Sequence, residues 1–152
     1  MKIATMLFVT FLLLFAQCKV LSTFKKTVET KQSNVNVKFQ SINGDYLNRR
    51  DSGSSIYSGP SVLNSEWRII YLSKGNIALQ STKGDYLMRT ANGVSVGHDN
   101  KLFNWQLTAN DGKICGQTVQ LKSNQGDYLY RDSDSTITTR EGGYAINWKV
   151  IC

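Results

Sequence analysis

The stretch that decides the fold is Gln80-Ser81-Thr82-Lys83-Gly84-Asp85-Tyr86-Leu87-Met88-Arg89, because the chain carries this pattern three times. Its counterparts occupy residues 40–49 and 122–131, and Ser, Gly-Asp-Tyr-Leu and Arg recur at the same offsets in every copy. The three glycines are 40 and then 42 residues apart. Each is followed after 21 to 23 residues by one tryptophan, and the chain has only these three: Trp67, Trp105 and Trp148. A period of this length indicates repeated structural units that share one core.

Each repeat predicts four short strands. Residues 35–40 alternate apolar and polar side chains, which is the pattern of a half-buried strand. Asn43 and Gly44 then predict a hairpin turn, because glycine permits the positive φ that such turns need. The repeats span about residues 35–72, 77–109 and 118–152. A propeller needs at least four blades, so three four-stranded units predict an all-β fold, a β-trefoil with pseudo-threefold symmetry.

The repeat also resembles that of a known family. Leu-Gln-Ser-x-x-Gly-x-Tyr-Leu at residues 79–87, followed by Trp105, is similar to the repeat of fascin-like β-trefoils. The resemblance covers residues 35–152 and implies the trefoil fold. Fascins bundle actin with several trefoils in one chain, whereas this chain has one, so no actin-contacting residue is carried over. Ricin-type lectins share the fold but have a Gln-x-Trp pattern, and here Ser65, Phe103 and Ile146 stand two residues before the tryptophans.

The first residues predict export. A basic Lys2, an apolar run over residues 3–16 and small residues at Ala16 and Cys18 match a secretory signal peptide, so we expect residues 1–18 to be removed and the protein to be extracellular. A single membrane anchor is the alternative, but the run is shorter than the roughly 20 residues that a spanning helix needs. Residues 19–34 are polar and basic and predict a flexible arm, followed by one trefoil domain at 35–152.

Cysteine content and net charge indicate the compartment of the protein and the kind of partner it binds. If Cys18 leaves with the leader, Cys115 and Cys152 remain, and we expect them to form a disulfide in an oxidising compartment. Without Lys2 the chain has 17 basic and 11 acidic residues, a net charge of +6. This surplus favours acidic partners, such as sulfated or sialylated glycans. Nucleic acid is a poor partner for an exported protein.

Residues common to all repeats are expected to serve the fold first. The tyrosines, leucines and tryptophans of the repeat predict core and cap packing, with stacking on a sugar as the alternative for an exposed ring. The aspartates after the turn glycines are expected to cap their own turns. Two readings stay open for the arginines that end the second strands: pairing with carboxylates, or a basic cluster for an anionic ligand. These arginines are Arg49, Arg89 and Arg131.

Ligand-binding residues are sought where the repeats differ, because the shared fold does not require those positions. The variable segments are residues 50–64, 91–104 and 132–147. A sugar site needs a few planar hydrogen-bonding side chains beside an aromatic ring. The side chains of this kind in the three segments are Tyr57, His98, Asp99, Asn100, Asp134, Arg140 and Tyr144.

The pattern favours binding over catalysis. His98 is the only histidine, and the sequence has no His/Cys metal cluster, no phosphate-binding loop and no nucleophile motif, so we expect neither an enzyme nor a cofactor. The sequence predicts a secreted, monomeric, lectin-like module for extracellular glycans, including anionic ones. The alternative is an extracellular ligand or inhibitor that recognises a protein through its trefoil loops.

Overall fold

The structure is a computed structural model, and it describes residues 34–99, 103–108, 113–141 and 147–152. The signal peptide predicted at 1–18 and all but the last residue of the arm predicted at 19–34 lie outside the described residues. Within the described part of the chain, every helix is too short or too polar to cross a membrane.

The described residues form twelve strands, as the repeat pattern predicts, and two short 3-10 turns. The bounds are β1 Val35–Gln40, β2 Tyr46–Arg49, β3 Ile56–Gly59, β4 Trp67–Tyr71, β5 Asn76–Ser81, β6 Tyr86–Thr90, β7 Gly93–Gly97, β8 Trp105–Thr108, β9 Thr118–Ser123, β10 Tyr128–Arg131, β11 Ile137–Arg140 and β12 Trp148–Ile151. The 3-10 turns are η1, Leu63–Ser65, and η2, Ser73–Gly75.

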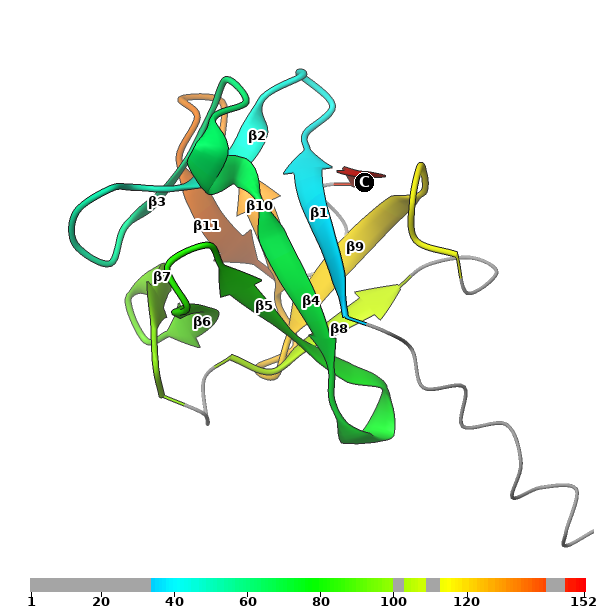
Figure 1. The fold of residues 1–152 in the computed structure, drawn as a ribbon. Helices are drawn as coiled ribbons and strands as arrows, with labels where there is room; N and C mark the ends of the chain where they lie inside the picture. The colour runs from blue at the N-terminus through cyan, green and yellow to red at the C-terminus, as the bar shows by residue number, and fades with distance from the viewer. Residues whose placement is uncertain (1–33, 100–102, 109–112, 142–146) are drawn as a thin grey trace, which may run out of the picture. The chain divides into compact units, whose positions relative to one another are not determined.

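Six of the strands close a barrel. Going round the barrel, β1 pairs with β4, β4 with β5, β5 with β8, β8 with β9, β9 with β12, and β12 with β1, all antiparallel. Figure 1 shows β1, β4 and β5 side by side in this wall. Closure removes the free edges that an open sheet would expose, so the first strand of repeat one is held by the last strand of repeat three.

The other six strands form three hairpins that cap the barrel. They are β2–β3, β6–β7 and β10–β11, one from each repeat. The second strands of these hairpins, β3, β7 and β11, contact one another. Loops from neighbouring repeats therefore meet in the cap, and each seam between two repeats combines residues that are far apart in the sequence.

The tryptophans fill the centre of the molecule. Trp67, Trp105 and Trp148 are fully buried, together with the leucine that follows each repeat tyrosine. Each indole N–H donates to the carbonyl of that leucine, over 3.0 Å, 2.9 Å and 3.3 Å in repeats one, two and three. Because a buried indole N–H needs an acceptor, this bond fixes the fourth strand of each repeat against the cap hairpin of the same repeat.

The prediction that the repeat tyrosines fill the interior is wrong. Tyr46, Tyr86 and Tyr128 are only half-buried. Successive residues of a strand point to opposite faces, so the inward leucine turns the preceding tyrosine outward. Two of these rings have partners outside the core: Tyr86 stacks on Phe103 with 4.6 Å between ring centroids, and the Lys122 ammonium lies 5.6 Å from the Tyr128 ring centroid.

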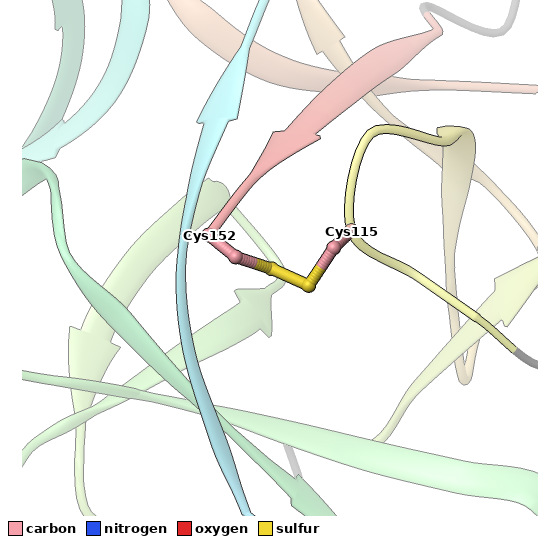
Figure 2. The surroundings of a disulfide bond; sticks show 2 residues. All are labelled: Cys115 and Cys152. Carbon is pink, nitrogen blue, oxygen red and sulfur yellow. A yellow bond between two sulfur atoms is a disulfide. The ribbon is translucent and has the colours of Figure 1, made fainter.

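The disulfide predicted between Cys115 and Cys152 is confirmed, with the two Cα atoms 5.5 Å apart. Figure 2 shows it joining the loop before β9 to the end of β12 beside β1. Two backbone hydrogen bonds of 2.8 Å, from Gly116 to Val150 and from Val150 to Gln117, hold the same loop against β12. The C-terminal strand is therefore fixed in the barrel where termini otherwise fray.

Candidate binding site at the seam of repeats three and one

The repeat arginines form ion pairs between repeats. Arg49 Nη2 lies 2.6 Å from Asp85 Oδ2 of repeat two, and Arg89 Nε lies 2.7 Å from Asp127 Oδ2 of repeat three. Arg131 Nη2 closes the circle at 2.5 Å from Asp45 Oδ2 of repeat one. Each arginine thus has a carboxylate partner in the next repeat, which is the first of the two roles that the sequence left open for this set.

We expected the aspartates to cap their own turns, but at Asp85 and Asp127 a neighbouring serine takes this role. In repeats two and three the serine hydroxyl accepts the turn N–H, over 3.1 Å from Lys83 to Ser81 and from Gln125 to Ser123. Those serine hydroxyls in turn donate to the carboxylates of Asp85 and Asp127. The carboxylate is therefore left to face the arginine of the preceding repeat, and the serine links the turn to the ion pair.

This environment controls the ionisation of two carboxyl groups. Burial by itself raises the pKa of Asp85, but hydrogen bonds from Arg49 and Ser81 outweigh burial and hold the pKa below its ordinary value. The pKa of Asp127 is lowered in the same way: burial alone would raise it, but hydrogen bonds that include those from Ser123 and Arg89 outweigh burial and hold it below its ordinary value. Both groups are carboxylates at neutral pH.

The seam between repeats three and one departs from this pattern. The Asp45 side chain is 31% exposed, against 10% for Asp85 and 8% for Asp127. Arg131 donates its Nε–H to Ser58 Oγ over 3.0 Å, whereas Arg49 and Arg89 give theirs to aspartate. The hydroxyl of Ser41, at the position of Ser81, is buried without a hydrogen-bond partner among the described residues. The third link therefore has the most exposed carboxylate and is less completely hydrogen-bonded than the other two.

A strained residue lies at the same seam. Ser135 has a φ of 69°, and it stands four residues after Arg131, where the other repeats have Gly53 and Gly93, both also at positive φ. A side chain in this region costs about 1 kcal/mol or more. The Ser135 hydroxyl accepts from Arg131 Nη2 over 2.8 Å and its carbonyl accepts from the Ser58 N–H over 3.3 Å. These two bonds hold the loop before β11 against β3.

A pocket of about 410 Å³ opens between these two segments. It brings together two of the residues that the sequence singled out, Tyr57 of β3 and Asp134 of the loop before β11. The Arg50 guanidinium carbon lies 5.1 Å from the centroid of the Tyr57 ring. The remaining lining residues are mainly hydroxyl-bearing: Ser55, Ile56, Ser58, Ser135 and Thr136. We call this hollow the seam pocket.

The other predicted site residues lie elsewhere or are not described. His98 and Asp99 are exposed at the end of β7, and the His98 ring lies edge-on to Tyr86 at 6.5 Å between centroids. Arg140 lies 4.3 Å from the Tyr130 ring centroid and 3.4 Å from Asp132 Oδ2. Asn100 and Tyr144 fall outside the described residues.

Sequence reasoning missed Arg50 and the hydroxyl residues of the seam pocket. A signal was present for two of them, because the repeats can be compared position by position. In each cap hairpin one residue is paired with the repeat leucine. This residue is Ser58 in repeat one, Val96 in repeat two and Thr139 in repeat three. Ser135 stands where the other repeats have glycine. Both departures mark the same seam.

Comparison with known proteins bears on the fold. No family model matches the chain, and no curated protein matches its sequence. Among solved structures, a designed threefold-symmetric protein named ThreeFoil is 16% identical with a TM-score of 0.63, and the match covers 77% of this chain and 98% of that one. The fold is a β-trefoil.

Two natural proteins contain a similar body. A chain of the Haemophilus ducreyi cytolethal distending toxin has a TM-score of 0.64 and 16% identity over 83% of this chain and 87% of its own. The GlcNAcα1-4Gal-releasing endo-β-galactosidase from Clostridium perfringens has a TM-score of 0.63 and 16% identity over 78% of this chain. The match spans only 32% of the galactosidase chain. At this level of identity the likeness establishes the fold alone.

Proposed function

We propose that this chain is a secreted, lectin-like binding protein and that the seam pocket takes a sugar unit of an extracellular glycan. The observation that carries the proposal is the seam pocket itself, where an aromatic ring, a guanidinium, a carboxylate and several hydroxyl groups meet. Ligand sites of this type combine an apolar face with a few polar groups that set orientation. The export signal, which the sequence predicts, would place this pocket among cell-surface and matrix glycans.

The Tyr57 ring supplies the apolar surface. It rests against Gly59, where an added Cβ would lie only 3.0 Å from Tyr57 Cε2. Because Gly59 has no side chain, the Tyr57 ring can lie directly against the backbone at this position. A fixed ring loses little conformational entropy on binding, which is why aromatic residues suit ligand contacts. The C–H face of a pyranose would stack on this ring.

The polar residues of the seam pocket would form hydrogen bonds with the sugar hydroxyls. Asp134 Oδ1 accepts the Thr136 N–H over 3.2 Å, which orders the carboxylate and leaves it further acceptor capacity. Arg50 supplies donors next to the ring. Hydrogen bonds to charged groups are the stronger ones, so Asp134 and Arg50 would contribute most to orientation.

Two wider considerations support a binding role. The similar galactosidase acts on a glycan, and trefoils in general carry their functions on grafted sites, with no activity implied by the fold. We propose that the chain is a fascin-like trefoil, on the basis of the repeat motif that resembles theirs. We also propose that the protein is a monomer without catalytic turnover.

A glycan array tests the proposal, using the mature protein and two variants. Tyr57→Ala is expected to lower binding to the recognised glycans at least tenfold. Tyr130→Ala is the matched control, because Tyr130 is also a tyrosine under an arginine, Arg140, but does not line the seam pocket. Its binding should stay within twofold of wild type. An array that remains blank for the wild-type protein would rule out the glycan function.

A protein ligand is the second candidate, and one observation favours it. In the loop between β3 and β4 the Leu63 side chain is 79% exposed and Val62 is 40% exposed. Exposed apolar side chains that lie together are typical of protein contacts. If the array is blank, cross-linking in extracellular fluid with wild type and Leu63→Ser distinguishes this function: a partner that Leu63→Ser fails to capture supports it, and equal capture excludes this loop.

A further inference from the structure

The outer wall of the barrel carries a polar row at each repeat. In the first row Lys149 of β12 lies between Gln40 of β1 and Thr118 of β9 in register. The equivalent rows are Gln80, Arg68 and Asn36 where repeat two meets repeat one, and Lys122, Gln106 and Asn76 where repeat three meets repeat two. Each row therefore sets one cation among amide or hydroxyl side chains.

A cleft of about 430 Å³ lies over the first row. Lys149, Gln40 and Thr118 line it together with Asn147, Ser41 and Ile42. Asn147 Oδ1 accepts from Gln120 Nε2 over 3.1 Å. This bond uses the oxygen of the Asn147 amide and leaves its N–H groups to donate to a ligand. The lining contains no acidic residue, and within the described residues Lys149 has no carboxylate within ion-pair distance. We call this hollow the wall cleft.

The equivalent cleft at repeat two has a different charge. It measures about 400 Å³, and its lining includes Glu66 as well as Arg68. A carboxylate in the same hollow offsets the guanidinium and repels anions. The two clefts thus share a geometry and differ in net charge, which makes the repeat-two cleft an internal comparison for the wall cleft.

Two further side chains distinguish the wall cleft. Ser41 is 4% exposed and its hydroxyl has no partner among the described residues, whereas Ser81 donates to Asp85. A buried hydroxyl without a partner costs free energy and is normally satisfied by a ligand or water. Ile42 at the hairpin tip is 88% exposed, where the other repeats have Thr82 and Asn124. The wall cleft therefore combines an apolar side chain, a buried serine hydroxyl that lacks a partner, and a cation that has no carboxylate partner among the described residues.

We propose that the wall cleft is a second ligand site and that it binds an acidic saccharide unit through its sulfate or carboxylate group. The Lys149 ammonium and the Asn147 amide contact the anion, and Ile42 covers the apolar face of the ring. Sulfate and carboxylate share the same chemistry here, as oxygen anions that accept from these donors. This site is separate from the seam pocket and does not depend on the function proposed for it.

The test measures binding of a heparin-derived hexasaccharide by calorimetry at two salt concentrations. Lys149→Gln is expected to weaken binding at least fivefold and to reduce its salt dependence. Arg68→Gln, the matched control in the repeat-two cleft, should change binding less than twofold. Equal effects of the two substitutions, or no binding by wild type at low salt, would overturn the proposal.

Three further binding measurements identify the ligand group and the residues that contact it. A fully desulfated hexasaccharide distinguishes the anions: if its binding still depends on Lys149 the ligand group is a carboxylate, and if binding is lost the group is a sulfate. Ser41→Ala should weaken binding at least twofold without lowering the unfolding midpoint, and unchanged binding would remove Ser41 from the site. Tyr57→Ala should leave hexasaccharide binding intact, and a fivefold loss there would place the acidic saccharide in the seam pocket and overturn the proposal.

Discussion

The three inter-repeat ion pairs should contribute unequally to stability, and this can be measured by removing one aspartate at a time. In Asp85→Ala the Arg49 guanidinium, whose side chain is 9% exposed, loses its carboxylate partner. Removing one partner of a buried pair typically costs about 3–5 kcal/mol, and we expect about 3 kcal/mol because the pair retains some solvent contact. With a urea m-value of about 2 kcal/mol/M, the unfolding midpoint falls by about 1.5 M.

Asp45→Ala should cost much less. Asp45 is 31% exposed, and Arg131 keeps hydrogen bonds to Ser58, Ser135 and the Asp132 carbonyl after its removal. A partly exposed charged hydrogen bond contributes about 1 kcal/mol, so the urea midpoint should fall by about 0.5 M. The assay is urea unfolding followed by tryptophan fluorescence at neutral pH, with the disulfide intact.

A double variant separates the cost of losing the ion pair from the cost of leaving the Arg49 charge buried without a partner. Arg49→Met with Asp85→Leu removes both charges, and replacement of a buried pair by apolar residues is often close to neutral. It should therefore be more stable than Asp85→Ala alone. An Asp45→Ala variant as destabilised as Asp85→Ala, or a double variant that is the least stable of the three, would contradict this ranking of the ion pairs.

Other properties follow from the same contacts. Stability should fall as pH drops below about 4, because Asp85 and Asp127 have lowered pKa values in the folded state and unfolding releases them toward the ordinary value of about 3.9; urea midpoints that stay constant from pH 5 to pH 2 would contradict this. Trp105→Phe removes the 2.9 Å bond to the Leu87 carbonyl and leaves a void, so it should cost about 2–3 kcal/mol in urea unfolding, and a loss under 1 kcal/mol would argue against a packed centre. Cys152→Ser opens a link across 37 residues and should cost about 3–4 kcal/mol; reduction of the wild type should lower the midpoint equally.

Much of the fold can be predicted from the sequence, because the repeat specifies local structure three times. The strand at Val35–Gln40 follows from alternation, and the hairpin after it follows from Asn43-Gly44. Closure into a barrel follows from having three units. The outward position of the tyrosines has the same origin, since adjacent residues of one strand point to opposite faces. Leu87 takes the buried face of β6, and Tyr86 therefore takes the other.

The candidate site was harder to predict, because it depends on which repeats meet. Tyr57 and Asp134 are distant in sequence and come together only when repeat three closes on repeat one. The ion pair of Arg131 with Asp45 likewise crosses that seam. The sequence shows that the arginine and the aspartate recur in every repeat, but barrel closure decides which arginine pairs with which aspartate. Departures from the repeat, such as Ser135 in place of glycine, were the only local signal.

The seam pocket can be located directly by following backbone amide resonances while a neutral glycan found on the array is titrated into the mature protein. We predict that the largest shifts fall on Tyr57, Asp134 and their neighbours at the seam of repeats three and one. The in-register positions of the second cap hairpin, such as Ser95, should move little. Shifts spread equally over the three repeats, or centred away from Tyr57 and Asp134, would contradict a sugar site in the seam pocket.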